Sequence, residues 1–329
     1  MSAITVSLRR QQNPQSQGYI QQFVVRAAPH HTTVLDLLHQ IQWEQDSTVV
    51  FRRNCRNAIC GSCAMKINGT SALACAVSAH QAMDAQQHIS IEPLGNLPVL
   101  RDLVVDMTRF WQNLEQVQPY VTTQPKQERE FRQTPQQRMK LQAGGNCILC
   151  GACYSECNAL GGNPNFIGPH ALAKADRILQ DNREARPAER LQRYNTSDMA
   201  WGCTRCYQCN EVCPVGVQPL DRITQVRQAI LQAQHLSVHT AMIHRRSMVQ
   251  LVQAGGWVAE SKLALQVLSD RGRNWHKLTQ VIPLAWRMLT KGKFPLPWQF
   301  KSSSATKEIR DLITRLQTPP DINTSKEKS

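Results

Sequence analysis

The sequence lacks two features that would place it in or across a membrane. No run of about 18 or more apolar residues occurs, and this excludes a transmembrane helix of ordinary type. Residues 1–10 carry charges but no apolar core of the length found in a secretory signal. We therefore expect a reducing compartment, where structural disulfides are rare.

Acidic residues are also scarce. The 329 residues include 24 Asp and Glu against 38 Lys and Arg, which gives a formal net charge of +14. That charge fits an anionic partner, such as an acidic protein face, a membrane surface or nucleic acid, but it also fits a merely soluble basic surface. No acid–base pair, activated nucleophile or nucleotide-binding loop stands out. At this length the chain has room for two domains and an appendage.

Cysteine, by contrast, is abundant, and none of the 12 cysteines is left over. They form three sets of four, each spaced as in an iron–sulfur site. The first set has the spacing of plant-type ferredoxins, which hold a [2Fe–2S] cluster, and the other two have that of bacterial two-cluster ferredoxins. The sets are Cys55, Cys60, Cys63 and Cys75; Cys147, Cys150, Cys153 and Cys157; and Cys203, Cys206, Cys209 and Cys213.

Zinc and disulfide bonds are the competing interpretations of these cysteines. Zinc usually takes two separated pairs of ligands, whereas each bacterial-type run here supplies three thiols at a period of three and then a fourth. In two-cluster ferredoxins the fourth cysteine of each run ligates the other cluster. We therefore expect two cubane sites with crossed ligands. They are Cys147, Cys150, Cys153 and Cys213 for one [4Fe–4S] cluster, and Cys157, Cys203, Cys206 and Cys209 for the other.

The N-terminal part of the chain is predicted to be strands around one helix. Alternating residues predict strands, an Asn-Gly pair predicts a hairpin turn, and Thr33 is suited to cap a helix. This pattern favours an α+β fold that opens with a β-grasp ferredoxin domain at 1–117. The expected strands are 4–8, 19–25, 64–67, 72–75 and 88–92, with a helix from Val34 to Ile41.

The middle of the chain is predicted to be helical. Apolar residues at helical spacing predict a packing helix over 100–114, and a Gln-rich, proline-containing stretch at 118–145 is expected to be a linker with one helix near 127–141. An α-helical two-cluster domain is expected at 146–235. Pro169 and Pro219 should each begin a helix, at 171–180 and 220–234.

The last part is a basic extension, expected to be helical over 236–317 and disordered over 318–329. Residues 245–301 contain ten Lys or Arg, two Asp or Glu, and Trp257, Trp275, Trp286 and Trp298. This mixture fits a docking surface or an interfacial helix. It fits an ordinary helical cap with a solvated basic face equally well.

Several motifs resemble the iron–sulfur subunit of succinate dehydrogenase and fumarate reductase. The resemblance covers about residues 1–235, and the motifs also occur in the same order. They are residues 52–63, Asn68-Gly69, 73–75, 97–107, 147–151 and 166–169.

The resemblance implies a relay. A flavoprotein partner would oxidise succinate at FAD, and electrons would pass through [2Fe–2S], [4Fe–4S] and a third cluster to quinone. The chain would lie on the cytoplasmic side of a membrane as a peripheral protein, without bond chemistry of its own. Gly151, Arg56 and backbone N–H groups are candidates for tuning cluster potentials. The histidines are expected to serve packing or the surface, because thiolates already supply every ligand.

Three departures from the family pattern matter. Cys206 stands where most members have a residue other than cysteine and hold a [3Fe–4S] cluster. Gly161-Gly162 replaces the tryptophan before Asn163-Pro164, and Thr204 replaces a histidine of the common quinone site. Asn158 replaces a proline without affecting ligation.

The extra cysteine, Cys206, and the basic C-terminal extension resemble a variant class that pairs with a cysteine-rich subunit like that of heterodisulfide reductase, in place of haem-bearing membrane helices. Two other functions stay open. One is a thiol-linked fumarate reductase, and the other, suggested only by charge, is an iron–sulfur regulator that binds nucleic acid. An ordered set of three clusters argues against the regulator, since a sensor needs one cluster.

Overall fold

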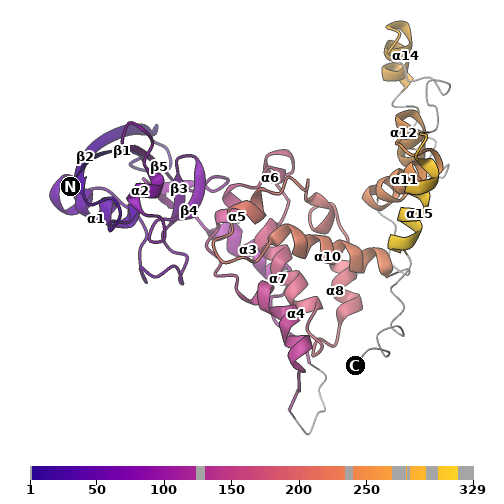
Figure 1. Cartoon of the computed structure of the whole chain (residues 1–329), viewed down its shortest axis with the longest axis horizontal. Helices are drawn as coiled ribbons and strands as arrows, with labels where there is room; N and C mark the ends of the chain where they lie inside the picture. The colour runs from indigo at the N-terminus through magenta and orange to yellow at the C-terminus, as the bar shows by residue number, and fades with distance from the viewer. Residues whose placement is uncertain are drawn as a thin grey trace. The chain divides into compact units, whose positions relative to one another are not determined.

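The computed structural model describes residues 2–123, 130–233, 240–268, 279, 282–293 and 303–317. The chain divides into two compact units, Met1–Leu236 and Ser237–Ser329. All twelve cysteines lie in the first unit, whose helices and strands up to α10 are shown in Figure 1.

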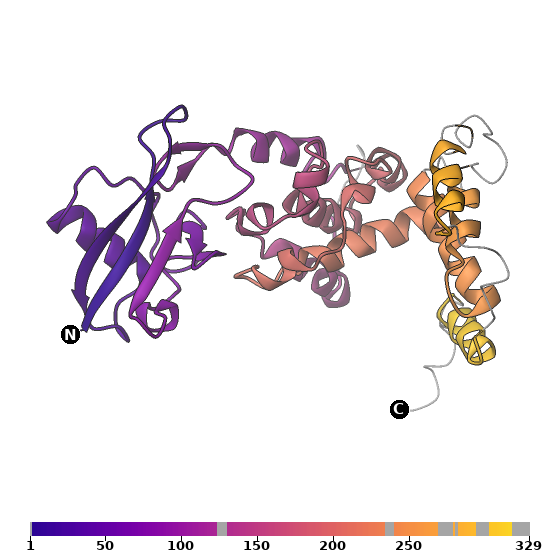
Figure 2. The ribbon, with the colours of Figure 1, turned by 90° about the horizontal axis from the view of Figure 1, so that it is seen from above.

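A five-stranded mixed sheet forms the N-terminal part of the first unit, in the order β2-β1-β5-β3-β4. β1 pairs antiparallel with β2 and parallel with β5. Helix α1 lies against the sheet (Figure 2), so the expected β-grasp arrangement of strands around one helix is confirmed. The elements are β1 (Ser2–Arg10), β2 (Tyr19–Ala27), α1 (Val34–Glu44), β3 (Ala64–Ile67), β4 (Thr70–Leu73), α2 (Ala79–Ala82) and β5 (His88–Glu92).

The sequence explains this packing directly. Thr33 caps α1 because its side chain accepts a hydrogen bond from the Asp36 backbone, and the Asp36 carboxylate accepts one from the Thr33 backbone. The apolar face of α1 and alternate residues of β1 are fully buried against each other, as period 3.6 and period 2 require. The buried residues include Ile4, Val6, Leu8, Leu37, Leu38 and Ile41.

The prediction of one helix over 100–114 is wrong for the first half of that range. A short hairpin, β6 (Val99–Arg101) and β7 (Val104–Val105), comes first, and helix α3 spans only Thr108–Gln116. Asp102 makes the turn with a φ of +45°. Its carboxylate accepts hydrogen bonds from the side chain of Arg10 and the backbones of Gln11 and Val50, each at 3.0 Å. These long-range contacts override the helical spacing of the apolar residues.

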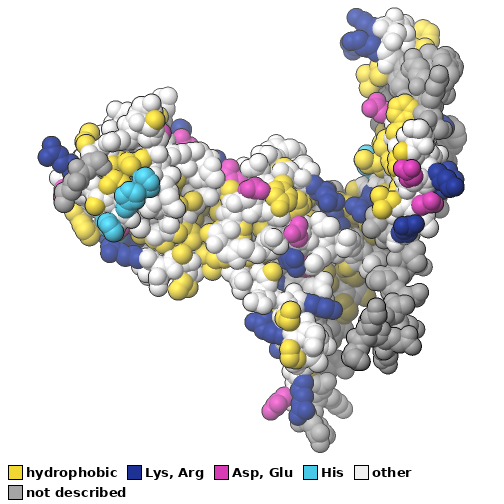
Figure 3. All heavy atoms as spheres, viewed as in Figure 1, with side chains coloured by type: hydrophobic (Ala, Val, Ile, Leu, Met, Phe, Trp, Pro, Cys, Tyr) yellow, Lys and Arg dark blue, Asp and Glu magenta, His cyan; other side chains and the backbone are white. Residues whose placement is uncertain are grey.

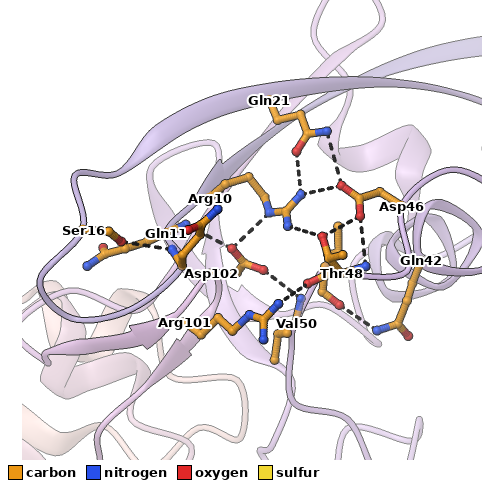
Figure 4. Close-up of polar contacts among 12 residues, drawn as sticks. Arg10, Gln11, Ser16, Gln21, Gln42, Asp46, Thr48, Val50, Arg101 and Asp102 are labelled. Atoms are coloured by element: carbon orange, nitrogen blue, oxygen red, sulfur yellow. Dashed lines mark hydrogen bonds and ion pairs between the residues drawn. The ribbon is translucent and has the colours of Figure 1, made fainter.

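Arg10 is the centre of this polar network (Figure 4). Its guanidinium binds Asp102 at 3.0 Å, Asp46 at 2.8 Å and Thr48 at 2.9 Å. Hydrogen bonds from Thr48 and Arg10 hold the pKa of Asp46 well below its usual range. The network thus fixes residues 46–50, directly before the first cysteine loop.

Short helices around two longer ones form the rest of the first unit. Helices α7 and α10 pack against each other at its centre, and Pro169 and Pro219 begin them as expected. In each cysteine run the first two cysteines lie in a loop, the third lies in α5 or α9, and the fourth follows that helix. The helices are α4 (Pro135–Gly145), α5 (Ala152–Ser155), α6 (Ala159–Gly162), α7 (Pro169–Leu179), α8 (Pro187–Tyr194), η1 (Ala200–Gly202), α9 (Gln208–Glu211) and α10 (Pro219–Gln232).

The stretch expected to be a linker is partly anchored. Arg190 of α8 donates hydrogen bonds to the carbonyls of Gln118, at 2.9 Å, and Tyr120, at 2.7 Å. Thr122 donates from its backbone to Glu184 at 3.0 Å. The helix in this stretch begins at Pro135, later than expected, and residues 124–129 lie outside the described part.

The second unit contains helices, as the sequence predicts. Helix α11 (Thr240–Gly255) packs against α12 (Glu260–Leu268) and α15 (Thr306–Gln317), and α14 spans Ile282–Thr290. The tail expected to be disordered, 318–329, lies outside the described residues, as do Trp275 and Trp298. Among the helices that are described, none combines the length and apolarity needed to span a membrane.

Candidate iron–sulfur sites

The first cysteine loop points backbone N–H groups at sulfur. Asn57 and Cys60 donate to the Sγ of Cys55, and Ala58 donates to that of Cys75, each at 3.3 Å. Positive φ angles at Arg56, Ala58 and Gly61 turn the backbone inward to make these bonds possible. N–H groups aimed at sulfur stabilise the thiolate, which is the form that binds iron.

The four thiols of this loop differ in their surroundings. Burial, with further effects from Cys75 and Cys60, raises the pKa of Cys63 to about 12. A hydrogen bond from the Ser62 side chain, together with backbone donors, lowers the pKa of Cys60 to about 6. The site is therefore buried on the side of Cys63, whereas hydrogen bonds on the side of Cys60 favour the thiolate.

The second group of thiols lines a small cavity. Cys147, Cys150, Cys153 and Cys213 all border it, so the fourth cysteine of the second run joins three from the first. Burial raises the pKa of Cys150 to about 11, and the neighbouring Cys147 and Cys213 raise it further. Apolar residues make up most of the remaining lining, including Ile148, Ala173, Val215 and Val217.

The third group consists of Cys203, Cys206 and Cys209 of the later run together with Cys157, the last cysteine of the earlier run. Burial raises the pKa of Cys209 to about 12, and Cys203, Cys157 and Cys206 contribute because they lie nearby. The pKa of Cys157 rises to about 11, again mainly through burial and also through Cys203 and Cys206. Cys206 is the only exposed cysteine. The second and third groups therefore each combine the first three cysteines of one run with the last cysteine of the other run.

The donor chemistry of these groups fits iron–sulfur clusters. Each offers four sulfurs, and backbone N–H groups point at several of them, including Arg205 to Cys203 at 3.4 Å and Val217 to Cys213 at 3.3 Å. Thiols buried so deeply resist ionisation alone, so their thiolates need a bound cation. No three or more His, Cys, Asp or Glu side chains in the described ranges are arranged to hold a metal ion by themselves.

The first and second groups meet at Gly61. A Cβ on Gly61 would lie 2.8 Å from the Cβ of Cys150 and 2.9 Å from its Cα, closer than real contacts allow. Gly61 also has a φ of +72°, which favours glycine. A cavity of about 180 Å³ adjoins this contact, lined by both Cys60 and Cys150. The two cysteine loops therefore touch through their backbones.

Hydrogen bonds hold the sheet domain against α5 and the residues that follow it. Asn96 donates to the carbonyls of Tyr154 and Ser155 at 2.9 Å and of Cys157 at 3.1 Å. Ser155 accepts from the backbone of Gly95 at 2.8 Å. The hydroxyl of Ser71 donates to Glu156 at 2.6 Å. These bonds fix the distance between the first thiol group and the other two.

Two histidines have partners that the local sequence does not indicate. The ring nitrogens of His39 lie 3.0 Å from Arg53 and 3.1 Å from Arg56, and burial followed by these cations lowers its pKa. His39 thus contacts Arg56, the residue suggested for tuning. His170 lines the second thiol cavity and stacks on Phe110 with ring centroids 3.7 Å apart. Burial lowers the pKa of His170 to about 3.

The positions that depart from the family pattern lie at the surface. Gly161, Gly162 and Thr204 are exposed, and a Cβ on either glycine would meet nothing within 4 Å. Gly151, the other suggested tuning residue, begins α5 with a φ of +86°.

Comparisons with known proteins agree with this arrangement. A 2Fe-2S iron-sulfur cluster binding domain matches residues 5–112, and a 4Fe-4S dicluster domain matches residues 144–217. The chain is similar in fold to a chain of the Mycobacterium smegmatis Sdh1 complex in the apo form. That match has a TM-score of 0.63 and 23% identity, and it covers 72% of this chain and 99% of the other.

Sequence relatives come from both enzymes of the resemblance. Succinate dehydrogenase [ubiquinone] iron-sulfur subunit 3 of Arabidopsis thaliana is 37% identical over 218 residues, 65% of this chain and 70% of that protein. The fumarate reductase iron-sulfur subunit of Haemophilus influenzae is 38% identical over 209 residues, 60% of this chain and 80% of its own length. This chain therefore belongs to the family of iron–sulfur subunits of succinate dehydrogenase and fumarate reductase.

Proposed function

We propose that this chain is the electron-transfer subunit of a succinate:quinone oxidoreductase. It accepts electrons from a FAD-bearing flavoprotein and passes them toward quinone by way of three clusters. The observation that carries the proposal is the grouping of twelve cysteines into three sets of four within one unit. The proposed domains are 1–117, a linker at 118–145, 146–235 and the extension 236–317.

The ligand assignment follows the thiol groups. Cys55, Cys60, Cys63 and Cys75 hold a [2Fe–2S] cluster; Cys147, Cys150, Cys153 and Cys213 hold a [4Fe–4S] cluster; Cys157, Cys203, Cys206 and Cys209 hold the third. When bound, each cluster supplies one-electron redox chemistry. The protein's own part is to ionise the thiols, aim N–H donors at them and exclude water.

Contacts between the groups support a fixed order. Gly61 brings the first cysteine loop against Cys150 of the second group. Cys209 of the third group is close enough to Cys153 of the second to add to the rise in its pKa, which burial dominates. Electrons enter at the exposed first loop and leave beside Cys206, the exposed cysteine of the third group.

The third site takes a [4Fe–4S] cluster, with [3Fe–4S] as the alternative. Each iron of a cubane needs its own ligand, and Cys206 supplies the one that most of the family lacks. The potential of such a cluster is lower than that of a typical [3Fe–4S] centre, which favours the last transfer to quinone. Quinone itself binds mainly in a partner subunit, because Gly161-Gly162 and Thr204 present little for it to bind.

The partners follow from this role. They are the flavoprotein and either a membrane-anchoring subunit or a cysteine-rich one of the heterodisulfide-reductase kind. The chain works as a peripheral protein on the cytoplasmic side of a membrane, and nucleic acid is not a partner.

Reduction by succinate tests the proposal. The chain, loaded with clusters under anaerobic conditions and mixed with its flavoprotein, should show succinate-dependent bleaching of its visible absorption. Fumarate added in excess should reoxidise it. The assignment would be contradicted if succinate did not bleach the visible absorption while another electron donor did. The control for this result is that the flavoprotein still oxidises succinate with an artificial acceptor.

A fumarate reductase is the second candidate, since fumarate reductase subunits are as similar to this chain as succinate dehydrogenase subunits. In a thiol-linked enzyme the electrons would run the other way, from a dithiol donor through the partner. The ratio of succinate oxidation to thiol-driven fumarate reduction in the purified complex separates the two.

A further inference from the structure

Helix α14 of the second unit carries apolar side chains that nothing in the described structure covers. Ile282, Leu284, Trp286 and Leu289 are each 52–68% exposed, and no residue of the helix is buried. The neighbouring helices behave differently, because α11 buries Met242 and Ile243 and packs against α12 and α15. Because these apolar side chains are exposed to water, an apolar environment that covers them would stabilise the helix.

The apolar side chains are not confined to one narrow stripe. At helical spacing, Ile282, Trp286 and Leu289 lie within about 60° of one another around the axis. Leu284 projects from the opposite side. A groove on a partner protein covers one face of a helix, whereas the boundary of a bilayer can surround several sides.

The charge around α14 indicates which apolar environment fits. Residues 271–307 contain eight Lys or Arg and no Asp or Glu. Arg287 lies in the last turn, and Lys291 and Lys293 follow directly, all exposed. Figure 3 shows cationic and hydrophobic side chains together at this end of the unit. Nucleic acid would satisfy the cations but would leave Ile282 and Leu289 in water.

Tryptophan next to cations is the composition of helices that lie in the membrane interface. Indole rings favour the headgroup level, and Lys and Arg side chains reach anionic phosphates from there. We propose that α14 inserts into the headgroup region of a membrane that contains anionic lipids, with Trp286 and Leu289 directed toward the acyl chains. The chain would thereby contact lipid itself, in addition to any contact made through partner subunits.

Vesicle binding of the full chain with its clusters loaded tests this inference. We expect sedimentation with vesicles of phosphatidylcholine and phosphatidylglycerol, and weaker binding to phosphatidylcholine alone or at high salt. Trp286→Glu should lower the partition onto anionic vesicles by about tenfold or more, since an indole no longer leaves water. Lys291→Glu combined with Lys293→Glu should remove most of the preference for anionic vesicles.

Trp43→Glu is the matched control. Trp43 lies in the first unit, and its exposed fraction, 68%, equals that of Trp286. Vesicle binding should stay unchanged in this variant. Visible absorption confirms in each variant that the clusters are intact, and reduction by the flavoprotein in detergent, without vesicles, tests the electron-transfer role separately.

Three results would overturn the inference. In the first, Trp286→Glu binds vesicles as the unaltered chain does. In the second, Trp43→Glu loses binding to the same extent as Trp286→Glu. In the third, the unaltered chain ignores vesicles, while Trp286→Glu loses a co-purifying subunit. That last result would assign α14 to a protein interface.

Discussion

The two bacterial-type cysteine runs have the same spacing but different surroundings. Leu149 and Arg205 both have a φ near +60°, and Gly151 and Tyr207 follow with φ of +86° and +72° before the short helices α5 and α9. The second cysteine of the first run, Cys150, lines a cavity and touches Gly61, whereas its counterpart Cys206 is exposed. One loop conformation therefore occurs in two different environments.

What surrounds each run explains the difference. The sheet domain covers the first run, through Gly61 and through the bonds of Asn96 to the end of α5. In the second run the described residues 204–208 are all exposed. A position that is buried and touched on every side tolerates little change, and an exposed one tolerates more.

Cys150→Ser should have the largest effect. It removes a ligand in a buried cavity, and in structural metal sites the binding free energy, on the order of 10 kcal/mol, is also folding free energy. We expect loss of the cluster held by Cys147, Cys153 and Cys213, together with much lower thermal stability. Iron content and calorimetry measure both. If this variant kept an intact four-iron site, the expected difference between the two runs in tolerance to substitution would be wrong.

Cys206→Ser should change the third cluster without unfolding the protein. With three thiolates left, one corner iron is easily lost, so a [3Fe–4S] signal should appear in EPR of the oxidised protein. The unaltered chain, purified without oxygen, should lack that signal. A strong [3Fe–4S] signal from the unaltered chain would refute the four-iron assignment.

Gly61→Ala should break the contact between the first and second groups. The new Cβ clashes with Cys150 and the positive φ becomes unfavourable, at a cost of about 1–3 kcal/mol. We expect normal cluster content but slower reduction of the second site after the first, followed by stopped-flow absorption. Gly162→Ala is the control, because its Cβ meets nothing within 4 Å. Equal slowing in both variants would show that the close approach is unimportant.

Asn96→Ala should have the smallest effect. It removes three hydrogen bonds to the carbonyls at the end of α5, and Asn96 is itself exposed, so we expect a loss of about 1–2 kcal/mol. Asn165→Ala, at another exposed position, should cost less than half as much. Denaturant unfolding of the loaded protein compares them. No difference would mean that the sheet domain is held by other contacts.

Much of this could be predicted from sequence because the informative features are local. Thr33 and Asp36 define the start of α1, the Asn68-Gly69 turn lies between β3 and β4, and Pro169 begins α7. The cysteine spacings predicted three sets of four, and their roles as ligands stay a prediction.

The features that sequence could not supply depend on residues far apart in the chain. Asp102 turns a stretch with helical spacing into a hairpin because Arg10, 92 residues away, binds its carboxylate. Nothing local indicates that Gly61 meets Cys150, or that His39 lies between two arginines. Exposure of Cys206 is likewise a product of packing, since its counterpart Cys150, in a run of the same spacing, is only partly exposed.

The Arg10 network has a consequence for the order of events during synthesis. Arg10 is made early, but its partner Asp102 emerges only after the whole first cysteine loop and Cys75. Until then Val50 lacks the carboxylate that accepts its backbone hydrogen bond, and the start of the loop that carries the thiols is not fully fixed. We therefore expect the first cluster to load after translation has passed residue 102, which makes iron delivery a late step in the maturation of this domain.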